Sequence, residues 1–192
     1  LCLIPDLPGE PNLTGRLAHS VRIPENARYV GILSRFTGAG QVDGNINIGA
    51  HNTLILSGPE PQRSKLGKII AGLQADGAIP LVILEGRPGV PDDDQVSGRI
   101  FSFNHLSSSE MRHVICSSKG IIARAGYTSI MELISLNCSA LLVPTPGQTE
   151  QEYLAAGLSE KGWFSSVRQK DLAGDLSLPS KDGRWPADIR DI

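Results

Sequence analysis

Short apolar runs bounded by turn residues recur between residues 53 and 167 and predict buried strands. The expected strands cover residues 53–57, 80–84, 99–103, 120–123, 139–143 and 163–167. Helical patterns separate most of them: one apolar stripe comprises Leu66, Ile69, Ile70 and Leu73, and a shorter one lies within residues 110–115. Strands that alternate with helices predict an α/β fold, a doubly wound parallel (Rossmann-like) sheet with right-handed crossovers.

Polar stretches interrupt this pattern. Residues 37–52 and 88–98 are rich in Gly, Asp and Pro and are expected to be loops. The second of them contains three consecutive aspartates, residues 92–94, which invite a metal interpretation. No strand fixes their geometry, so we expect no metal site there. Near the N-terminus, residues 28–33 are expected to form a further strand.

The composition limits only the size of the domain and the broad class of protein. The 192 residues are 40% hydrophobic, enough for the core of one α/β domain with additional segments. The net charge of −2 argues against nucleic acid as a partner. Three cysteines are odd in number and lack metal-ligand spacing, which is typical of a reducing cytoplasm. No apolar run approaches the ~20 residues of a membrane span, and no signal peptide is expected.

The turn after the fourth expected strand carries the clearest chemistry. An apolar strand ends just before Gly126, and a helix begins at once. A helix leaves its first backbone N–H groups unpaired, so Tyr127, Thr128 and Ser129 can offer amides to phosphate oxygens. Gly126 has no Cβ and lets a bulky anion approach. This pattern predicts a site for a nucleotide diphosphate, although an ordinary strand-to-helix turn would look similar.

Glu132 and Arg124 flank this turn. Glu132 lies off the apolar face of the helix, where a carboxylate can accept hydrogen bonds from both ribose hydroxyls. The alternative is a solvated helix residue. Arg124 either neutralises phosphate or fixes the helix by an ion pair, and the sequence favours neither.

The next strand, residues 139–143, leads into a second polar loop. Asn137 is expected to end the preceding helix in the left-handed conformation. Residues 144–152 then read Pro-Thr-Pro-Gly-Gln-Thr-Glu-Gln-Glu and place a stiff loop before another helix. Loops beyond the carboxyl ends of parallel strands bind ligands in open α/β sheets, so both loops are expected to face one crevice.

These two segments, 124–132 and 144–152, resemble the donor-binding half of the GT-B glycosyltransferases. The resemblance is to the family 28 type, bacterial enzymes that transfer N-acetylglucosamine from its UDP derivative to a lipid-linked muramoyl-pentapeptide. In that family an Arg-Ser-Gly segment meets the diphosphate, and a glutamate six residues after the glycine holds the ribose. Gly126 and Glu132 match this pattern, while Ala125 replaces the serine.

The polar loop of that family contacts the donor sugar through residues that include paired glutamines. Gln148 lies in the corresponding loop, Gln151 matches the first glutamine and Glu152 replaces the second. The replacement leaves the donor sugar open. The resemblance spans roughly residues 50–172.

The resemblance also implies donor contacts at the turn after the first sheet strand. Candidates there are Ser57, Gly58, Gln62 and Arg63, with the guanidinium of Arg63 the strongest for an anion. A capped helix with a surface arginine is the alternative. Phe103 and His105 follow the third strand, where resembling enzymes receive uracil; Phe103 either stacks on the base or belongs to the core.

As a whole, the resemblance implies the C-terminal half of a GT-B fold. Residues 1–36 would be the tail of a preceding domain and a linker, 37–175 the donor-binding domain, and 176–192 a C-terminal extension. The expected activity is transfer of a hexosamine or hexose from a UDP-sugar, with UDP-N-acetylglucosamine the first candidate, to a lipid-linked or saccharide acceptor. No metal or other cofactor is expected. The protein would be cytoplasmic, or peripheral at the inner face of the membrane.

The catalytic base is expected in an N-terminal acceptor domain of the same protein, so this chain alone should be inactive. His19 and His51 can be argued as a base, but no sequence feature orients either. Two alternatives stay open: a nucleotide-sugar hydrolase or epimerase on the same fold, and a non-catalytic donor-binding subunit of a split transferase.

Overall fold

A mostly parallel seven-stranded sheet organises the chain. The computed structural model describes residues 1–19, 22–36, 46, 48–75, 77–87, 95–174, 176 and 178–189. In spatial order the sheet comprises β5 (Gln95–Ser97), β6 (Ile100–Phe103), β4 (Leu81–Leu84), β3 (Asn52–Ile55), β7 (Gly120–Ala123), β8 (Leu141–Leu142) and β9 (Ser165–Ser166). All neighbours pair in parallel except β5 and β6. The predicted α/β fold class is therefore confirmed.

The six parallel strands follow a doubly wound order. Counted along the chain from β3, their order across the sheet is 3-2-1-4-5-6. β3 pairs with β4 on one side and β7 on the other, with Ile55 opposite Leu84 and Ala123. These three strands are buried along their whole length, as their continuous apolar runs predict.

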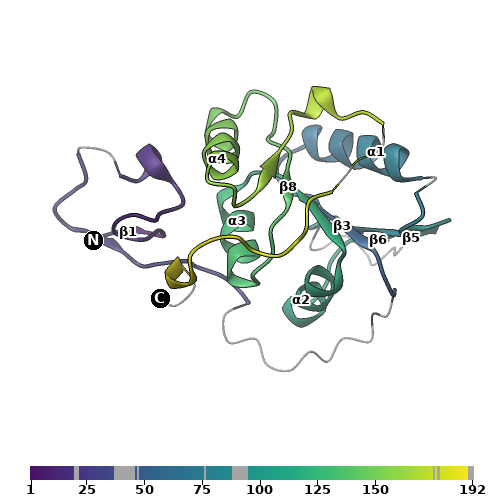
Figure 1. The fold of residues 1–192 in the computed structure, drawn as a ribbon, viewed down its shortest axis with the longest axis horizontal. Helices are drawn as coiled ribbons and strands as arrows, with labels where there is room; N and C mark the ends of the chain where they lie inside the picture. The colour runs from purple at the N-terminus through teal and green to yellow at the C-terminus, as the bar shows by residue number, and fades with distance from the viewer. Residues whose placement is uncertain are drawn as a thin grey trace.

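Helices cover both faces of this sheet (Figure 1). α1 (Gln62–Gln74) packs on one face through Leu66 and Ile70, in a cluster with Leu54 of β3. The other face carries α2 (Ser108–Ser117), α3 (Tyr127–Ser135) and α4 (Thr149–Glu160), whose buried residues share one core cluster. The chain crosses the sheet in one direction from β3 to β4 and in the opposite direction from β6 to β7. Because both crossovers are right-handed, α1 and α2 lie on opposite faces.

Several local expectations are confirmed and others are wrong. Asn137 ends α3 with φ 55°, the expected left-handed conformation. Residues 88–98 were expected to form a loop, yet β5 lies within them, because Gln95–Ser97 can pair antiparallel with the edge strand β6. The expected strand at 28–33 is shorter and displaced, since β2 covers Ala27–Tyr29. Residues 37–45, 47 and 88–94, including the aspartate triplet, lie outside the described residues.

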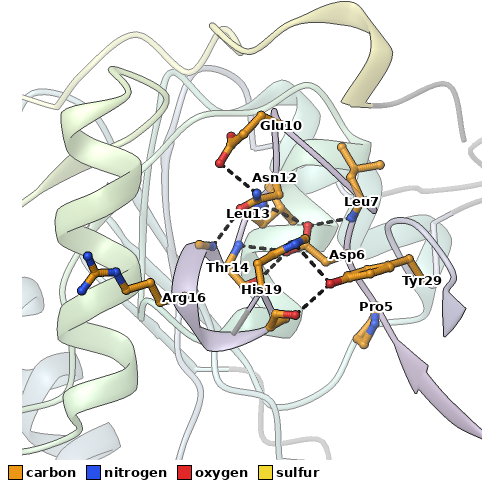
Figure 2. A network of polar contacts seen from close by, with 12 residues as sticks. Pro5, Asp6, Leu7, Glu10, Asn12, Leu13, Thr14, Arg16, His19 and Tyr29 are labelled. Atoms are coloured by element: carbon orange, nitrogen blue, oxygen red, sulfur yellow. Dashed lines mark hydrogen bonds and ion pairs between the residues drawn. The ribbon is translucent and has the colours of Figure 1, made fainter. Parts of the chain in front are cut away.

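The N-terminal segment folds around one buried carboxylate (Figure 2). β1 (Cys2–Ile4) pairs in parallel with β2. Directly after β1, Asp6 is fully buried and accepts hydrogen bonds from the backbone N–H groups of Leu7, Leu13 and Thr14 and from the Thr14 hydroxyl. This carboxylate thus organises the chain between the two strands.

His19 joins the same network. Its Nε2 lies 3.2 Å from Asp6 Oδ2, and its Nδ1 lies 3.1 Å from the Tyr29 hydroxyl. The imidazole also stacks on the Tyr29 ring, with centroids 5.0 Å apart. The expectation that nothing orients His19 is therefore wrong. Both ring nitrogens are engaged, so the histidine serves the fold of this segment.

The N-terminal segment also contacts α3 and α4. The Tyr127 hydroxyl, at the start of α3, donates to the carbonyl of Pro5. Ser135, at the end of α3, donates to the Ser34 hydroxyl at 2.7 Å. Lys161, just after α4, donates to the Asn12 carbonyl at 2.7 Å. Residues 1–36 are thus joined to the sheet domain through side chains at several points.

After β9 the chain first packs against the α1 cluster through Leu172, Leu176 and Leu178, and then reaches the face that carries α3 and α4. Trp185 is buried and stacks on Phe164, with ring centroids 5.6 Å apart. Asp182 forms an antiparallel bridge with Cys138, next to the end of α3. Among the helices of the described residues, none combines the length and apolar character needed to cross a membrane.

Replacing Asp6 with Asn should destabilise the N-terminal segment. The amide group would turn a donor toward N–H groups that now face the carboxylate, at a cost of about 2–4 kcal/mol. Urea denaturation followed by circular dichroism, with hydrogen exchange of the amides in residues 2–29, would measure the loss. Asp171→Asn is the matched control, because Asp171 forms a surface ion pair with Arg168 and should cost less than about 1 kcal/mol. Equal effects of the two substitutions would contradict the role assigned to Asp6.

Candidate functional site

A cavity of about 410 Å³ opens at the carboxyl ends of β3, β4 and β6. Its lining includes no residue of β7 or of positions 124–128, but it reaches the end of β3, beside the point where β3 and β7 meet and the strand order reverses. That is the point at which open α/β sheets bind ligands. Seven residues proposed from the sequence as ligand contacts line this cavity: Ser57, Gly58, Arg63, Phe103, His105, Ser129 and Glu132.

The start of α3 borders the cavity. Gly126 occupies the N-cap position with φ −74° and ψ 136°, and no side chain caps the helix. A Cβ at Gly126 would lie 3.9 Å from both the Ser57 and Ser129 hydroxyl oxygens, and both serines line the cavity. The turns after β3 and β7 therefore approach each other here. The uncapped first turn can bind an anion through its backbone N–H groups, as the sequence predicts for Tyr127 and Thr128.

Glu132 is bound to an arginine that the sequence analysis missed. Its side chain is mostly buried, and both carboxylate oxygens engage Arg35. Arg35 Nε lies 2.8 Å from Glu132 Oε1, and a second guanidinium nitrogen donates to Oε2 at 3.2 Å. Arg35 also lies over the Phe36 ring, 5.3 Å from its centroid. The partners are 97 positions apart, so no sequence signal indicated the pair.

Arg63 is likewise paired within the site. Its guanidinium donates to Glu60 Oε1 at 3.0 Å and lines the cavity. Hydrogen bonds from the Ser64 hydroxyl and backbone N–H, with a further contribution from Arg63, lower the pKa of Glu60. Both guanidinium groups that line the cavity, those of Arg35 and Arg63, are thus held by carboxylates in the described part of the chain.

Arg124 joins several separate segments of the chain through its hydrogen bonds. Its side chain is almost fully buried, and it donates to the carbonyl oxygens of Gln62, Val143 and Pro144. It also donates to Gln169 Oε1 at 2.7 Å, and burial lowers its pKa to about 10. Of the two roles expected for Arg124, the geometry favours fixing the structure, although through carbonyl groups. A contact between Arg124 and a phosphate stays a prediction.

The second polar loop is closed by its own side chains. Gln151 accepts a hydrogen bond from the Thr145 N–H at 2.9 Å and donates to Gln148 Oε1 at 2.5 Å. Glu152 accepts from the Gly147 N–H at 3.3 Å. None of Gln148, Gln151 and Glu152 lines the 410 Å³ cavity. Glu152 instead borders a separate cavity of about 550 Å³ beyond the ends of β8 and β9.

Of the aromatic and histidine candidates, some lie at the cavity and one lies away from it. Phe103 and His105 both line the cavity, and Phe103 also packs against the core, so both roles weighed for it remain compatible with its position. His51 is buried away from the cavity, with its ring nitrogens 2.8 Å from the Gly49 carbonyl and 3.1 Å from the Val114 carbonyl. Within the described residues, no cluster of three His, Cys, Asp or Glu could hold a metal ion.

Comparisons with known proteins agree with this architecture. The calicheamicin glycosyltransferase CalG4 matches with 15% identity and a TM-score of 0.54, over 78% of this chain and 36% of its own. The kitacinnamycin glycosyltransferase matches with 16% identity and a TM-score of 0.54, over 76% of this chain and 38% of its own. The fold is therefore that of one half of a GT-B glycosyltransferase.

A more specific similarity is found in the sequence. Residues 93–179 match the model of the glycosyltransferase family 28 C-terminal domain, which confirms the resemblance inferred from the two loops. A curated relative in Caldanaerobacter subterraneus subsp. tengcongensis is 32% identical over 82 residues, 42% of this chain. That protein is a UDP-N-acetylglucosamine–N-acetylmuramyl-(pentapeptide) pyrophosphoryl-undecaprenol N-acetylglucosamine transferase, and the match covers 21% of its length.

Replacing Gly126 with Ala should weaken anion binding and leave the fold intact. The added Cβ meets nothing closer than 3.9 Å. The poorer N-cap and the lower entropy of the unfolded chain offset each other, so the free energy of unfolding should change by less than about 1 kcal/mol. Calorimetric titration with inorganic pyrophosphate, beside urea denaturation, would measure both effects.

Gly120→Ala provides the contrasting variant. Its Cβ would lie 2.7 Å and 2.8 Å from side-chain atoms of Leu178, far from the cavity. Overpacking of this kind costs about 1–3 kcal/mol. Gly120→Ala should therefore reduce stability and leave pyrophosphate affinity unchanged in the folded protein. If Gly120→Ala weakened pyrophosphate binding and Gly126→Ala did not, the proposed site would be contradicted.

Proposed function

We propose that this chain is the donor-binding part of a glycosyltransferase and that it binds a UDP-sugar in the 410 Å³ cavity. The observation that carries the proposal is the convergence of the uncapped α3 start and the Glu132 carboxylate on one cavity at the point where the strand order reverses. The similarity of residues 93–179 to the family 28 C-terminal domain supports the same proposal.

The nucleotide would be held in three parts. The diphosphate would accept hydrogen bonds from the first N–H groups of α3, where Gly126 leaves room for it. The ribose hydroxyls would donate to Glu132, and uracil would lie against the loop that carries Phe103 and His105. Because Arg35 now occupies both oxygens of Glu132, a bound ribose would have to share or displace that guanidinium.

Transfer would proceed by displacement at the anomeric carbon, with inversion. The helix N-terminus would stabilise the negative charge that develops on the departing diphosphate. A base must deprotonate the acceptor hydroxyl. His19 and His51 have both ring nitrogens engaged, so we assign the base to an acceptor-binding domain outside this chain. The isolated chain would then bind the donor without transferring it.

UDP-N-acetylglucosamine is the first candidate donor, because the curated relative is named for transfer of that sugar. The donor sugar would lie near the second polar loop, where Glu152 borders the 550 Å³ cavity. Because Glu152 replaces a glutamine of the family, a hexose other than N-acetylglucosamine is also compatible with the proposal. A lipid-linked or saccharide acceptor, and a place at the inner face of the cytoplasmic membrane, complete the proposal.

UDP should bind the isolated chain and leave UDP-N-acetylglucosamine chemically intact. Isothermal titration calorimetry with UDP would measure the affinity, and chromatography of the incubated donor would detect hydrolysis. Binding with no turnover is the expected result. If millimolar UDP produced no heat and no change in melting temperature, the proposed donor site would be rejected.

Glu132→Ala should distinguish UDP from an analogue without ribose hydroxyls. Hydrogen bonds to a charged group contribute about 1.5–3 kcal/mol, so UDP affinity should fall at least about ten-fold. Affinity for 2′,3′-dideoxyuridine diphosphate should change little, because it cannot donate to Glu132. Glu150→Ala, which removes an exposed acid in the first turn of α4, is the control. Equal losses for the two nucleotides would reject the ribose contact.

A further inference from the structure

One ion pair occupies the carboxylate that the proposed ribose contact requires. Glu132 and Arg35 both line the 410 Å³ cavity. Arg35 Nε lies 2.8 Å from Glu132 Oε1, and a terminal guanidinium nitrogen donates to Oε2 at 3.2 Å. Each carboxylate oxygen thus has its own N–H donor. A ribose offers two hydroxyl donors, so the guanidinium and a ribose present the same hydrogen-bonding pattern to Glu132.

The two partners of this pair differ in their access to solvent. The Glu132 side chain is 11% exposed, whereas the Arg35 side chain is 46% exposed. A carboxylate at that depth is costly to leave without donors, because little water reaches it. The guanidinium of Arg35 can return to water at a much smaller cost. The pair therefore separates most readily when another donor reaches Glu132 and Arg35 turns outward.

The backbone on either side of Arg35 is anchored independently of the ion pair. Ser34 accepts a hydrogen bond from the Ser135 hydroxyl at 2.7 Å, and Phe36 is buried in the main core. The Arg35 guanidinium also lies 5.3 Å from the centroid of the Phe36 ring, whose face attracts a cation. Because both neighbours hold the chain in place, Arg35 can leave Glu132 by rotation of its side chain alone.

The pair of Arg63 with Glu60 differs from this arrangement. Glu60 also accepts hydrogen bonds from the Ser64 backbone N–H and hydroxyl, and it is not part of the cavity lining. Its side chain is 46% exposed. A ligand in the cavity therefore has no buried acceptor to gain by displacing Arg63. The pair of Arg35 with Glu132 is the one that a ribose would have to open.

We propose that the Arg35–Glu132 pair is an autoinhibitory contact, in which Arg35 competes with the ribose of the donor for Glu132. The guanidinium holds the carboxylate until a nucleotide with both ribose hydroxyls takes its place. A nucleotide without these hydroxyls leaves the pair intact. The competition rests on the proposed donor site and limits its affinity, because opening the pair offsets part of the free energy gained from the ribose contacts.

The ratio of the affinities for UDP and 2′,3′-dideoxyuridine diphosphate tests the competition. Both nucleotides carry the same base and diphosphate, so any contact of Arg35 with those groups cancels in the ratio. Arg35→Ala should raise the ratio about three- to five-fold, because the ribose then meets a carboxylate that no guanidinium occupies. Isothermal titration calorimetry with each nucleotide would measure it.

Two further variants make this result specific. Arg28→Ala removes an exposed arginine of the same segment, which donates to the Glu25 and Ala27 carbonyls, and should leave the ratio unchanged. In a Glu132→Ala background, Arg35→Ala should have no effect on the ratio. UDP binding with a ratio that falls or stays constant in Arg35→Ala would reject the competition alone. If neither the unmodified chain nor Arg35→Ala bound UDP, the donor site would be rejected together with it.

Ionic strength provides a second measurement, which needs no variant. Salt screens a partly exposed ion pair, so the ratio for the unmodified chain should rise about two-fold between about 0.1 M and about 1 M sodium chloride. The two nucleotides carry equal charge, so the effect of salt on the diphosphate cancels. The ratio for Arg35→Ala should stay constant over the same range. A ratio for the unmodified chain that does not rise with salt would contradict the competition.

Discussion

The pairing of β3 with β7 is the contact on which the rest of the structure depends. From β3 the chain winds outward through β4 and β6, then returns through α2 to lay β7 against the free side of β3. Loops that leave the two strands must then diverge to opposite faces, because α1 and α3 cover opposite faces. The divergence opens the cavity at the ends of the strands.

Charged groups around that cavity already neutralise one another. Glu132 is bound by Arg35 and Arg63 is bound by Glu60. The terminal nitrogens of Arg124 donate to carbonyl groups and Gln169, while its buried Nε has no hydrogen-bond partner. Breaking either pair would leave its less exposed member, Glu132 or Arg63, without its partner. Any anion that enters must therefore rely first on the backbone amides of α3, which have no competing cap. Side-chain charges are arranged around these amides as a second contribution.

Sequence reasoning succeeded where a signal is local. The continuous apolar runs of β3, β4 and β7 and the left-handed Asn137 follow from periodicity and backbone preference over a few residues. It failed where partners are distant in the chain. Asp6 with His19, and Arg35 with Glu132, look like ordinary polar positions until the fold brings them together. β5 was missed because an edge strand of three polar and apolar residues carries no burial pattern.

The bonds made by α3 show how its position is determined. Pro5 is bonded to the first residue of the helix, Arg35 to its middle and Ser34 to its last residue. The helix is thus held along its outer side by residues that precede the first strand of the sheet, and along its inner side by the sheet itself. The N-terminal residues therefore contact the helix at both of its ends as well as in its middle. A displacement of these N-terminal residues relative to the sheet would therefore act directly on this helix, and with it on the row of amides at its start.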